Sequence, residues 1–261
     1  MGGAQGRAGS LTLRASGLVT LGGAINGAAR DGGGSLGIDS GGSFDFDAFA
    51  AAPQGFTGAI DIRVGAGDLI LSSGRQLGAT SLLLAAEDGR VAIDGAIDTS
   101  GVNGGDVSLY GRSGVRLGAT ARIDASADGY AATDSRQASA GDIILGTDGD
   151  GAVEVASGAQ IDVRALRPGN RLVPVIRNGE TLFSYVDSDQ GGTLTLRAPI
   201  IEQDGPDSVN IAFGGAVTGA RGIAVEAYRR WDLGAVAADS GFTGVTISDG
   251  AAVLDTAQAA G

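Results

Sequence analysis

The chain has 261 residues, 48 of them glycine, and a formal net charge of −12 at pH 7; it contains no histidine and no cysteine, and all 18 basic residues are arginine. The missing residue types exclude Ser-His-Asp and Cys-His nucleophiles, ordinary zinc sites, disulfides, Walker A loops and lysine Schiff bases, so we expect neither a metal nor a cofactor. The acidic balance argues against a nucleic-acid partner, which requires concentrated positive charge.

The sequence shows no targeting segment. Its first ten residues, MGGAQGRAGS, lack the charged and then apolar regions of a signal peptide. The longest uncharged apolar run is far shorter than the roughly 20 residues that a membrane-spanning helix needs. We therefore expect no membrane span, and either an intracellular protein or an internal piece of a longer chain.

Short apolar pairs recur along the chain in the pattern small, apolar, any, apolar. Each pair alternates with period two, which is typical of a short strand with one buried face. The pattern occurs in five segments, which begin at Gly9 (GSLTLRA), Thr80 (TSLLLAA), Gly105 (GDVSLYG), Gly141 (GDIILGT) and Gly191 (GGTLTLR). A second apolar pair follows each segment: Val19 and Leu21, Val91 and Ile93, Val115 and Leu117, Val153 and Val155, and Val209 and Ile211.

A third step follows in four repeats, at Ile25-Asn26, Ile97-Asp98, Ile123-Asp124 and Ile161-Asp162. Three short strands in about 25 residues favour an all-β, right-handed parallel β-helix (a solenoid), in which each repeat is one coil. We expect Leu82, Val107, Ile143 and Leu194 to lie in one aligned file. The alternative is a β-sandwich, which also has short strands and regular turns but lacks a repeating unit of this kind.

We treat residues 1–261 as one β-helix segment with three stretches that interrupt the repeat and bulge from the stack. Residues 39–59 hold four of the seven phenylalanines and include DFDAFAAAP, one of two weak helix patterns; the other is AAVLDTAQAA near the C-terminus. Residues 125–140 are polar and are expected to form a loop. Residues 164–191 place Asn178-Gly179 between two alternating apolar runs, which predicts an antiparallel hairpin.

Asp98, Asp124 and Asp162 should occupy equivalent positions in different coils. A column of carboxylates would bind Ca²⁺ or, in an enzyme, would hold the acid and base of polysaccharide cleavage. Alternatively, each aspartate forms an Asx-turn with its own backbone. We favour the Asx-turn, because aspartate recurs wherever a turn does, and we expect no catalytic, cofactor-binding or metal-binding residue.

The hairpin stretch gathers basic and aromatic residues on an acidic chain. They are Arg164, Arg167, Arg171, Arg177, Phe183 and Tyr185. Such a patch is a candidate contact surface for an anionic glycan or a partner protein. Alternatively, the two aromatic side chains pack the hairpin onto the stack while the arginines balance local aspartates.

The order of several motifs over most of residues 9–233 resembles filamentous-haemagglutinin-like exoproteins of two-partner secretion systems. The motifs are GGSFDFDAF, AIDTSGVNGGDVSLYGRSGVRLGATARIDASADG, GDIILGTDGDGAVEVASGAQIDV, GGTLTLRAP and GARGIAVEAYRRWDL. The resemblance implies a right-handed β-helical shaft of a large surface or secreted protein of Gram-negative bacteria, exported through a dedicated outer-membrane transporter. The amino-terminal secretion domain and a carboxy-terminal toxin are not recognisable, so we expect an internal shaft segment.

We therefore expect a structural segment and not an enzyme. It would extend an adhesin-type exoprotein on the bacterial outer surface and contact a host-cell or bacterial glycan, a protein or a matrix component. Two alternatives stay open. One is a carbohydrate-active β-helix enzyme that uses aspartate carboxylates; the other is a fibre module that assembles end to end, because unpaired strand edges invite association.

Overall fold

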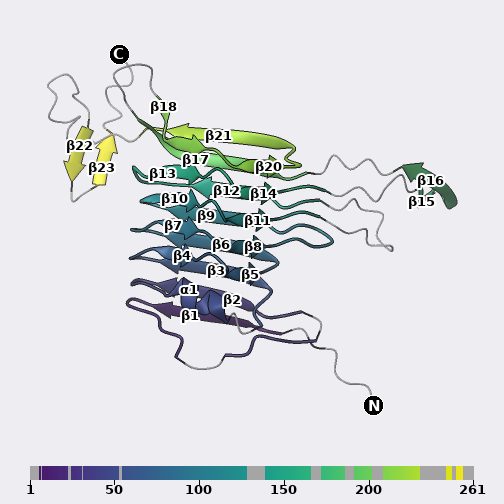
Figure 1. Cartoon of the computed structure of the whole chain (residues 1–261), viewed down its shortest axis with the longest axis horizontal. Coiled ribbons are helices and arrows are strands. Elements are labelled where there is room, and N and C mark those ends of the chain that lie inside the picture. The colour runs from purple at the N-terminus through teal and green to yellow at the C-terminus, as the bar shows by residue number, and fades with distance from the viewer. Residues whose placement is uncertain are drawn as a thin grey trace. The chain divides into compact units, whose positions relative to one another are not determined.

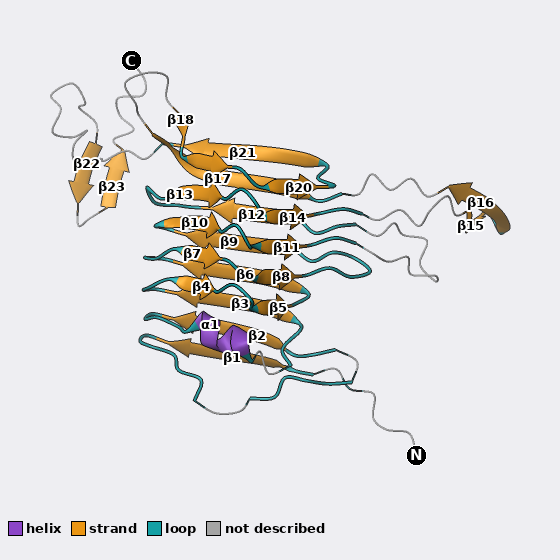
Figure 2. Cartoon of the chain, in the orientation of Figure 1, coloured by secondary structure: helices purple, strands orange, loops and turns teal. Residues whose placement is uncertain are grey.

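The computed structural model consists mainly of short β-strands (Figure 2). It describes residues 6, 8–22, 25–30, 32–52, 55–127, 139–165, 172–185, 191–201, 208–229, 245–248 and 251–254. The chain comprises two compact units, Met1–Ala227 and Tyr228–Gly261, and the main sheets and the core belong to the first. In the described residues, no helix is both long and apolar enough to cross a lipid bilayer.

The first unit contains three sheets built mainly of stacked parallel strands (Figure 1). Sheet A contains β1 (Ser10–Ala15), β2 (Ser35–Ser40), β3 (Ala59–Val64), β6 (Ser81–Ala86), β9 (Val107–Gly111), β12 (Ile143–Gly146), β17 (Thr193–Ile201), β18 (Ser208–Val209) and β21 (Gly222–Tyr228). Sheet B contains β4 (Leu69–Leu71), β7 (Val91–Ile93), β10 (Gly114–Leu117), β13 (Ala152–Val155) and β19 (Ile211–Phe213). Sheet C contains β5 (Gln76–Gly78), β8 (Ala96–Asp98), β11 (Arg122–Asp124), β14 (Gln160–Asp162) and β20 (Ala216–Thr218).

The chain visits these sheets in a fixed order. From β3 to β14, a strand of sheet A is followed by a strand of sheet B and then by a strand of sheet C. We call such a set a rung; β6, β7 and β8 form one rung, and β9, β10 and β11 form the next. Each strand pairs in parallel with its equivalent in the neighbouring rung. The chain is therefore an all-β protein built on parallel sheets.

The register of sheet A confirms the predicted file. Leu82 lies opposite Val107, Val107 opposite Ile143, and Ile143 opposite Leu194. All four side chains are at most 2% exposed. Burying a side chain of this size contributes about 1.5–3 kcal/mol, so a file of them is a substantial part of the stability.

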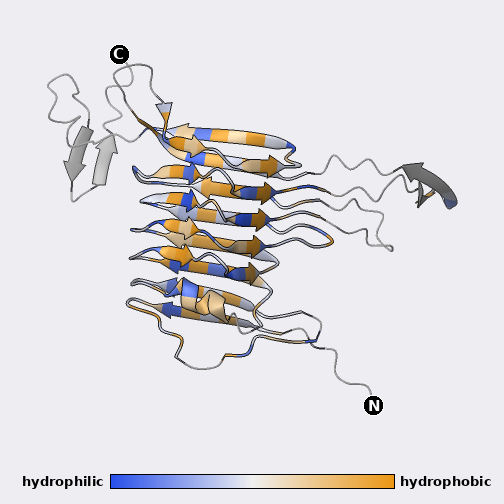
Figure 3. Ribbon diagram, viewed as in Figure 1, coloured by the Kyte–Doolittle hydropathy of each residue, from blue (hydrophilic) through white to orange (hydrophobic). Residues whose placement is uncertain are grey.

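Sheets B and C carry files of the same kind. Their buried members are Val91, Val115 and Val153 in sheet B, and Ile97, Ile123 and Ile161 in sheet C. The files of all three sheets belong to one hydrophobic core. Apolar and polar residues alternate along the strands, as Figure 3 shows, because successive side chains point to opposite faces of a sheet.

Two of the predicted second pairs do not form as expected. Val209 lies in β18, which pairs antiparallel with the end of β17, and the sheet B positions are taken by Ile211 and Phe213. The reason is that β17 continues to Ile201, so the chain first turns back along its own strand before entering sheet B. Val19 and Leu21 are half-buried against the core but lie outside any strand.

The stretch 39–59 interrupts the strand repeat with the short helix α1 (Phe46–Ala51), as its pattern predicted. The Asp45 carboxylate begins the helix by accepting a hydrogen bond from the Ala48 N–H at 2.9 Å. Phe46 and Phe49 are buried in the core, as are Phe44 and Phe56. The stretch therefore packs onto the core instead of bulging away from it, because four aromatic side chains gain more from burial than from exposure.

The stretch 164–191 contains the predicted antiparallel hairpin, formed by β15 (Leu172–Arg177) and β16 (Glu180–Tyr185). Asn178 and Gly179 both adopt positive φ angles, 53° and 81°, as a tight hairpin turn requires. Of the predicted loop 125–140, residues 128–138 lie outside the described residues.

In the second unit, β22 (Val245–Ser248) pairs antiparallel with β23 (Ala251–Leu254). The helix predicted from AAVLDTAQAA is therefore wrong for Ala251–Leu254. The sequence Asp249-Gly250 separates two apolar runs, and this arrangement favours a hairpin over a helix. The prediction of a single domain over residues 1–261 stays a prediction.

Glycines precede the sheet A strands where neighbouring rungs approach most closely. A Cβ atom added at Gly141 would meet the carbonyl oxygen of Gly105, and one added at Gly192 would meet the carbonyl oxygen of Gly141. These contacts are with backbone atoms, which cannot rotate away. The repeats therefore begin with a small residue because neighbouring rungs lie too close together there for a side chain.

Replacing Gly141 by alanine should lower the free energy of unfolding by about 2 kcal/mol, because the added methyl group forces two rungs apart. Urea unfolding followed by circular dichroism measures the change. Gly17→Ala is the matched control, since a Cβ at Gly17 has no neighbour within 4 Å. Equal stability of the two variants would contradict the close approach.

Candidate functional site

The three predicted aspartates do lie in one column. Asp98 lies opposite Asp124, and Asp124 lies opposite Asp162, at the ends of β8, β11 and β14 in adjacent rungs. The parallel register of sheet C puts them there, because each aspartate follows the buried isoleucine of its strand. This confirms the predicted equivalence of the three positions.

Each carboxylate is engaged by the residue two positions further along the chain. The Oδ1 atom of Asp124 accepts hydrogen bonds from the backbone N–H of Ser126 at 3.0 Å and from its hydroxyl at 2.6 Å. Asp98 makes the same two bonds with Ser100, at 3.0 and 2.6 Å. These are Asx-turns, and they close the corner at which the chain leaves sheet C.

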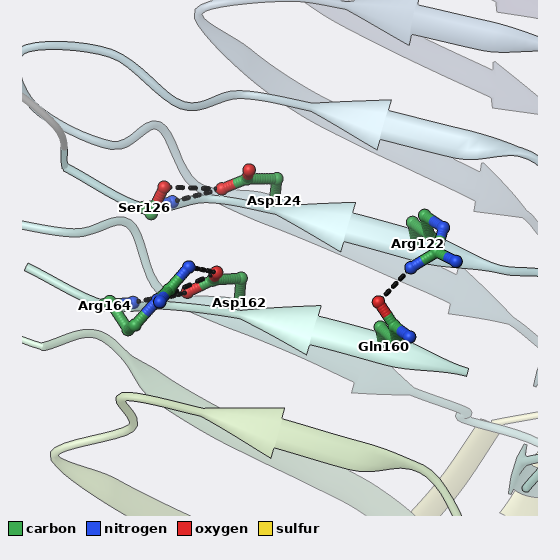
Figure 4. Close-up of polar contacts among 6 residues, drawn as sticks. All are labelled: Arg122, Asp124, Ser126, Gln160, Asp162 and Arg164. Carbon is green, nitrogen blue, oxygen red and sulfur yellow. Dashed lines mark hydrogen bonds and ion pairs between the residues drawn. The ribbon is translucent and has the colours of Figure 1, made fainter. Parts of the chain in front are cut away.

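Asp162 makes the same turn with a different partner. Its Oδ1 atom accepts the backbone N–H of Arg164 at 3.0 Å, and the Arg164 guanidinium lies 2.5 Å from Oδ2 (Figure 4). This ion pair raises the pKa of the Arg164 side chain. At the other end of the two strands, Arg122 donates a hydrogen bond to the side-chain carbonyl of Gln160. The side chains of Arg122, Gln160 and Asp162 in sheet C thus each have a polar partner.

The Asx-turns limit the calcium binding and the acid–base catalysis that were considered for these three aspartates. A carboxylate that accepts two bonds from its own turn has fewer lone pairs left for a cation or a substrate. Within the described part of the chain, no group of three or more Asp or Glu side chains is placed to hold a metal ion. The main role of the three aspartates in the column is therefore to form turns.

The predicted contact surface is only partly described. Arg164 pairs with Asp162 and so balances a local aspartate, which was the alternative interpretation for the arginines. Arg167 and Arg171 lie outside the described residues. Arg177, Phe183 and Tyr185 lie on the hairpin strands, where backbone pairing joins Arg177 to Glu180 and Leu172 to Tyr185. The six residues thus remain a candidate surface from sequence.

Outside the aspartate column, the carboxylate of Asp47 in α1 connects the helix to the turn after β4, and we call this connection the brace. Its Oδ1 atom accepts the backbone N–H of Ser72 at 2.7 Å, and its Oδ2 atom lies 3.3 Å from Nε of Arg75. The bond from Ser72 and the charge of Arg75 together hold the pKa of Asp47 below its ordinary value of 3.8. Asp47 thereby ties α1 to the segment between β4 and β5.

A hollow of about 480 Å³ lies between α1 and residues 18–21. Phe44, Phe49 and Leu21 give it an apolar wall, and Asp45 provides a carboxylate that already begins the helix. The hollow therefore has the lining of an apolar contact region.

The outer face of sheet A is a feature that the sequence analysis missed. Tyr110 lies opposite Gly146, and a Cβ added at Gly146 would be 2.9 Å from two atoms of the Tyr110 ring. The ring therefore lies over the glycine on the outside of the sheet. The alternation of the sequence could not reveal this contact, because Tyr110 and Gly146 become neighbours only once the register of β9 and β12 is known.

Comparisons with known proteins assign no function to this arrangement. No protein-family model, curated protein or solved structure matches the chain. The functional argument therefore rests on the column of Asx-turns, the stacked rungs and the outer faces of the sheets.

The variant Asp47→Asn tests the brace. The pKa of Asp47 is lowered in the folded chain. The ionised Asp47 carboxylate therefore stabilises the fold fully above pH 3.8, and this stabilisation is lost as the pH falls through the lowered pKa of the folded state. At pH 7 the variant should be less stable by about 1 kcal/mol, and the gap should close below pH 3.8.

Urea unfolding of both proteins between pH 7 and pH 3 measures this gap. Asp88→Asn, in an exposed turn between β6 and β7, is the control and should match the parent chain at pH 7. A gap that stays constant down to the lowest pH would show that the Asp47 charge does not stabilise the fold.

Proposed function

We propose that the three sheets form a right-handed parallel β-helix and that the chain is a shaft segment of a large secreted or surface-exposed bacterial exoprotein of the filamentous haemagglutinin type. Its function is then to extend and to display. Such a role requires length and stiffness from a simple repeat, and it needs no reaction chemistry of its own.

The observation that carries this proposal is the unbroken register of sheet A. From β1 to β17, each successive parallel strand of sheet A places an aliphatic residue in the same inward file, which is half-buried at Leu11 and buried at its other members: Leu36, Ile60, Leu82, Val107, Ile143 and Leu194. A rung contacts mainly its two neighbours, so each added rung lengthens the structure by the strand spacing of about 4.8 Å. This is the property that a shaft needs.

The state of the aspartates favours a scaffold over a carbohydrate-active enzyme. An acid and base pair for glycoside cleavage needs carboxylates that are free to exchange protons with a substrate. Asp98 and Asp124 instead each accept two bonds from their own turns. The same side chains that an enzyme would use are here part of the corners of the stack.

The proposal includes the location and partners expected of a surface protein. The parent protein would cross the outer membrane through a dedicated transporter, and the hairpin surface, with Arg177, Phe183 and Tyr185, would contact a glycan, a protein or a matrix component. Protease treatment of intact cells of the source organism tests the location: surface exposure predicts loss of the protein without cell lysis.

Deletion of one complete rung tests the shaft function. Removing residues 82–106 joins Ser81 to Val107, and these positions are consecutive in the repeat because Leu82 and Val107 are equivalent. The shortened chain should keep its strand content and unfold cooperatively. Deletion of residues 82–93, which removes β6 and β7 but leaves β8, is the control and should unfold the chain.

Circular dichroism and urea unfolding compare the two deletions. If both deletions unfold the chain equally, rungs are not interchangeable units and the shaft function fails. Release of reducing sugar or unsaturated uronate from polysaccharides by the intact chain, lost on Asp124→Asn, would replace the shaft function by an enzymatic one.

A further inference from the structure

The outer face of sheet A carries two files of outward side chains, separated by the buried file between them. The first file consists of Thr12, Gly37, Asp61, Leu83, Ser108, Ile144 and Thr195. The second file consists of Arg14, Asp39, Arg63, Ala85, Tyr110, Gly146 and Arg197. The two members from one strand are two residues apart and point to the same side.

The middle of this face is apolar except for Ser108. Leu83, Ala85, Tyr110 and Ile144 are half-buried there, and the Tyr110 ring covers Gly146. The centre of the outer face of sheet B carries the charged residues Arg116 and Glu154 beside Ala92, and that of sheet C carries Arg122 and Gln160. Sheet A therefore combines an apolar centre with a charged border, which is the composition of a protein contact surface.

In three of the seven strands, the two files carry residues that complement each other. In β6 a large residue, Leu83, accompanies a small one, Ala85, and in β12 Ile144 accompanies Gly146. In β3 the two residues are Asp61 and Arg63, whose charges are opposite. A surface that carries both partners of each pair can bind a copy of itself.

We propose that sheet A is the interface of a symmetric dimer of this chain. A two-fold axis along the stacking direction turns the strands of a second copy antiparallel to those of the first and keeps equivalent rungs level. The first file of each copy then faces the second file of the other. This gives a closed, isologous contact, in which each pair of residues occurs twice.

The symmetry matches size in β6 and β12 and charge in β3. Ile144 faces Gly146 of the second copy and Leu83 faces Ala85 of the second copy, so large side chains meet small ones. Asp61 faces Arg63 of the second copy. Within one chain, Nε of Arg63 lies 3.2 Å from Oδ1 of Asp61, and the side chains of Asp61 and Arg63 are 51% and 48% exposed. In the dimer, each of them gains a second partner of opposite charge and is shielded from water.

The size of the face sets the expected strength. Seven strands spaced by about 4.8 Å and about 17 Å long give roughly 500 Å² per copy, or about 1,000 Å² in total, which is at the lower limit for a specific interface. The dimer should therefore form and dissociate reversibly. This inference does not depend on the proposed shaft function.

Sedimentation velocity of the full chain from low to high micromolar concentration tests the dimer. The parent chain should convert from monomer to dimer and stop there. Ile144→Glu should keep the chain monomeric, because it places a charge in the apolar centre of the face. Ile70→Glu is the matched control, since Ile70 is 44% exposed on the outer face of sheet B, and it should leave the dimer intact.

A charge exchange tests the symmetry itself. Asp61→Arg alone and Arg63→Asp alone should each weaken the dimer at least about tenfold, because like charges then face each other twice. The double variant Asp61→Arg/Arg63→Asp restores opposite charges and should restore the dimer. Both substitutions are on exposed side chains, and circular dichroism checks that the three variants retain the fold.

Three results would overturn the inference. The first is a monomer at every concentration. The second is equal loss of the dimer with Ile144→Glu and Ile70→Glu. The third is growth beyond the dimer as the concentration rises, which would mean that the ends of the stack associate and not the face of sheet A.

Discussion

The structure depends on one constraint, which is that alternate side chains of successive rungs must share a dry interior at the spacing of paired strands. Parallel backbone hydrogen bonds fix that spacing, and a slip by one residue would move every buried side chain to the outside. Leu84, Leu109 and Leu145 meet the constraint in sheet A, and Val115 and Val153 meet it in sheet B. The aliphatic composition of the chain follows from it, because branched aliphatic side chains fill a narrow interior without needing polar partners.

The polar residues follow from the same constraint. At each corner the chain must turn sharply, and the backbone of one rung lies close to that of the next. Aspartate meets the first need at Asp124, because its carboxylate bonds to the turn, and glycine meets the second at Gly141, because it has no Cβ. Asp142 links one rung to the next, since its Oδ1 atom accepts a hydrogen bond from the backbone N–H of Thr193 in the next rung at 2.7 Å. The acidic balance of the chain thus comes partly from the requirements of its turns.

Much of this could be predicted from the sequence, because the signals are local. Period-two alternation identified the file from Leu82 to Leu194, and Asn178-Gly179 identified the hairpin. The sequence did not reveal that Ile211 and Phe213, and not Val209 and Ile211, take the sheet B positions. Which pair does so depends on how far β17 continues before the chain turns. The outer face of sheet A was missed because Tyr110 and Gly146 become neighbours only once the register is known. Outward residues carry no alternation signal of their own, so their relations depend on long-range pairing.

Distances along one outward file test the central constraint most directly. The chain has no cysteine, so the variants Arg14→Cys/Arg197→Cys and Arg63→Cys/Arg197→Cys can each be spin-labelled at two defined positions. Dilution with unlabelled chain confines pulsed electron paramagnetic resonance to distances within one molecule. Stacked rungs place these residues six and four strand spacings apart in sheet A, so we expect distances of about 29 Å and about 19 Å. Two distances that do not differ by about 10 Å would contradict a stack of registered rungs.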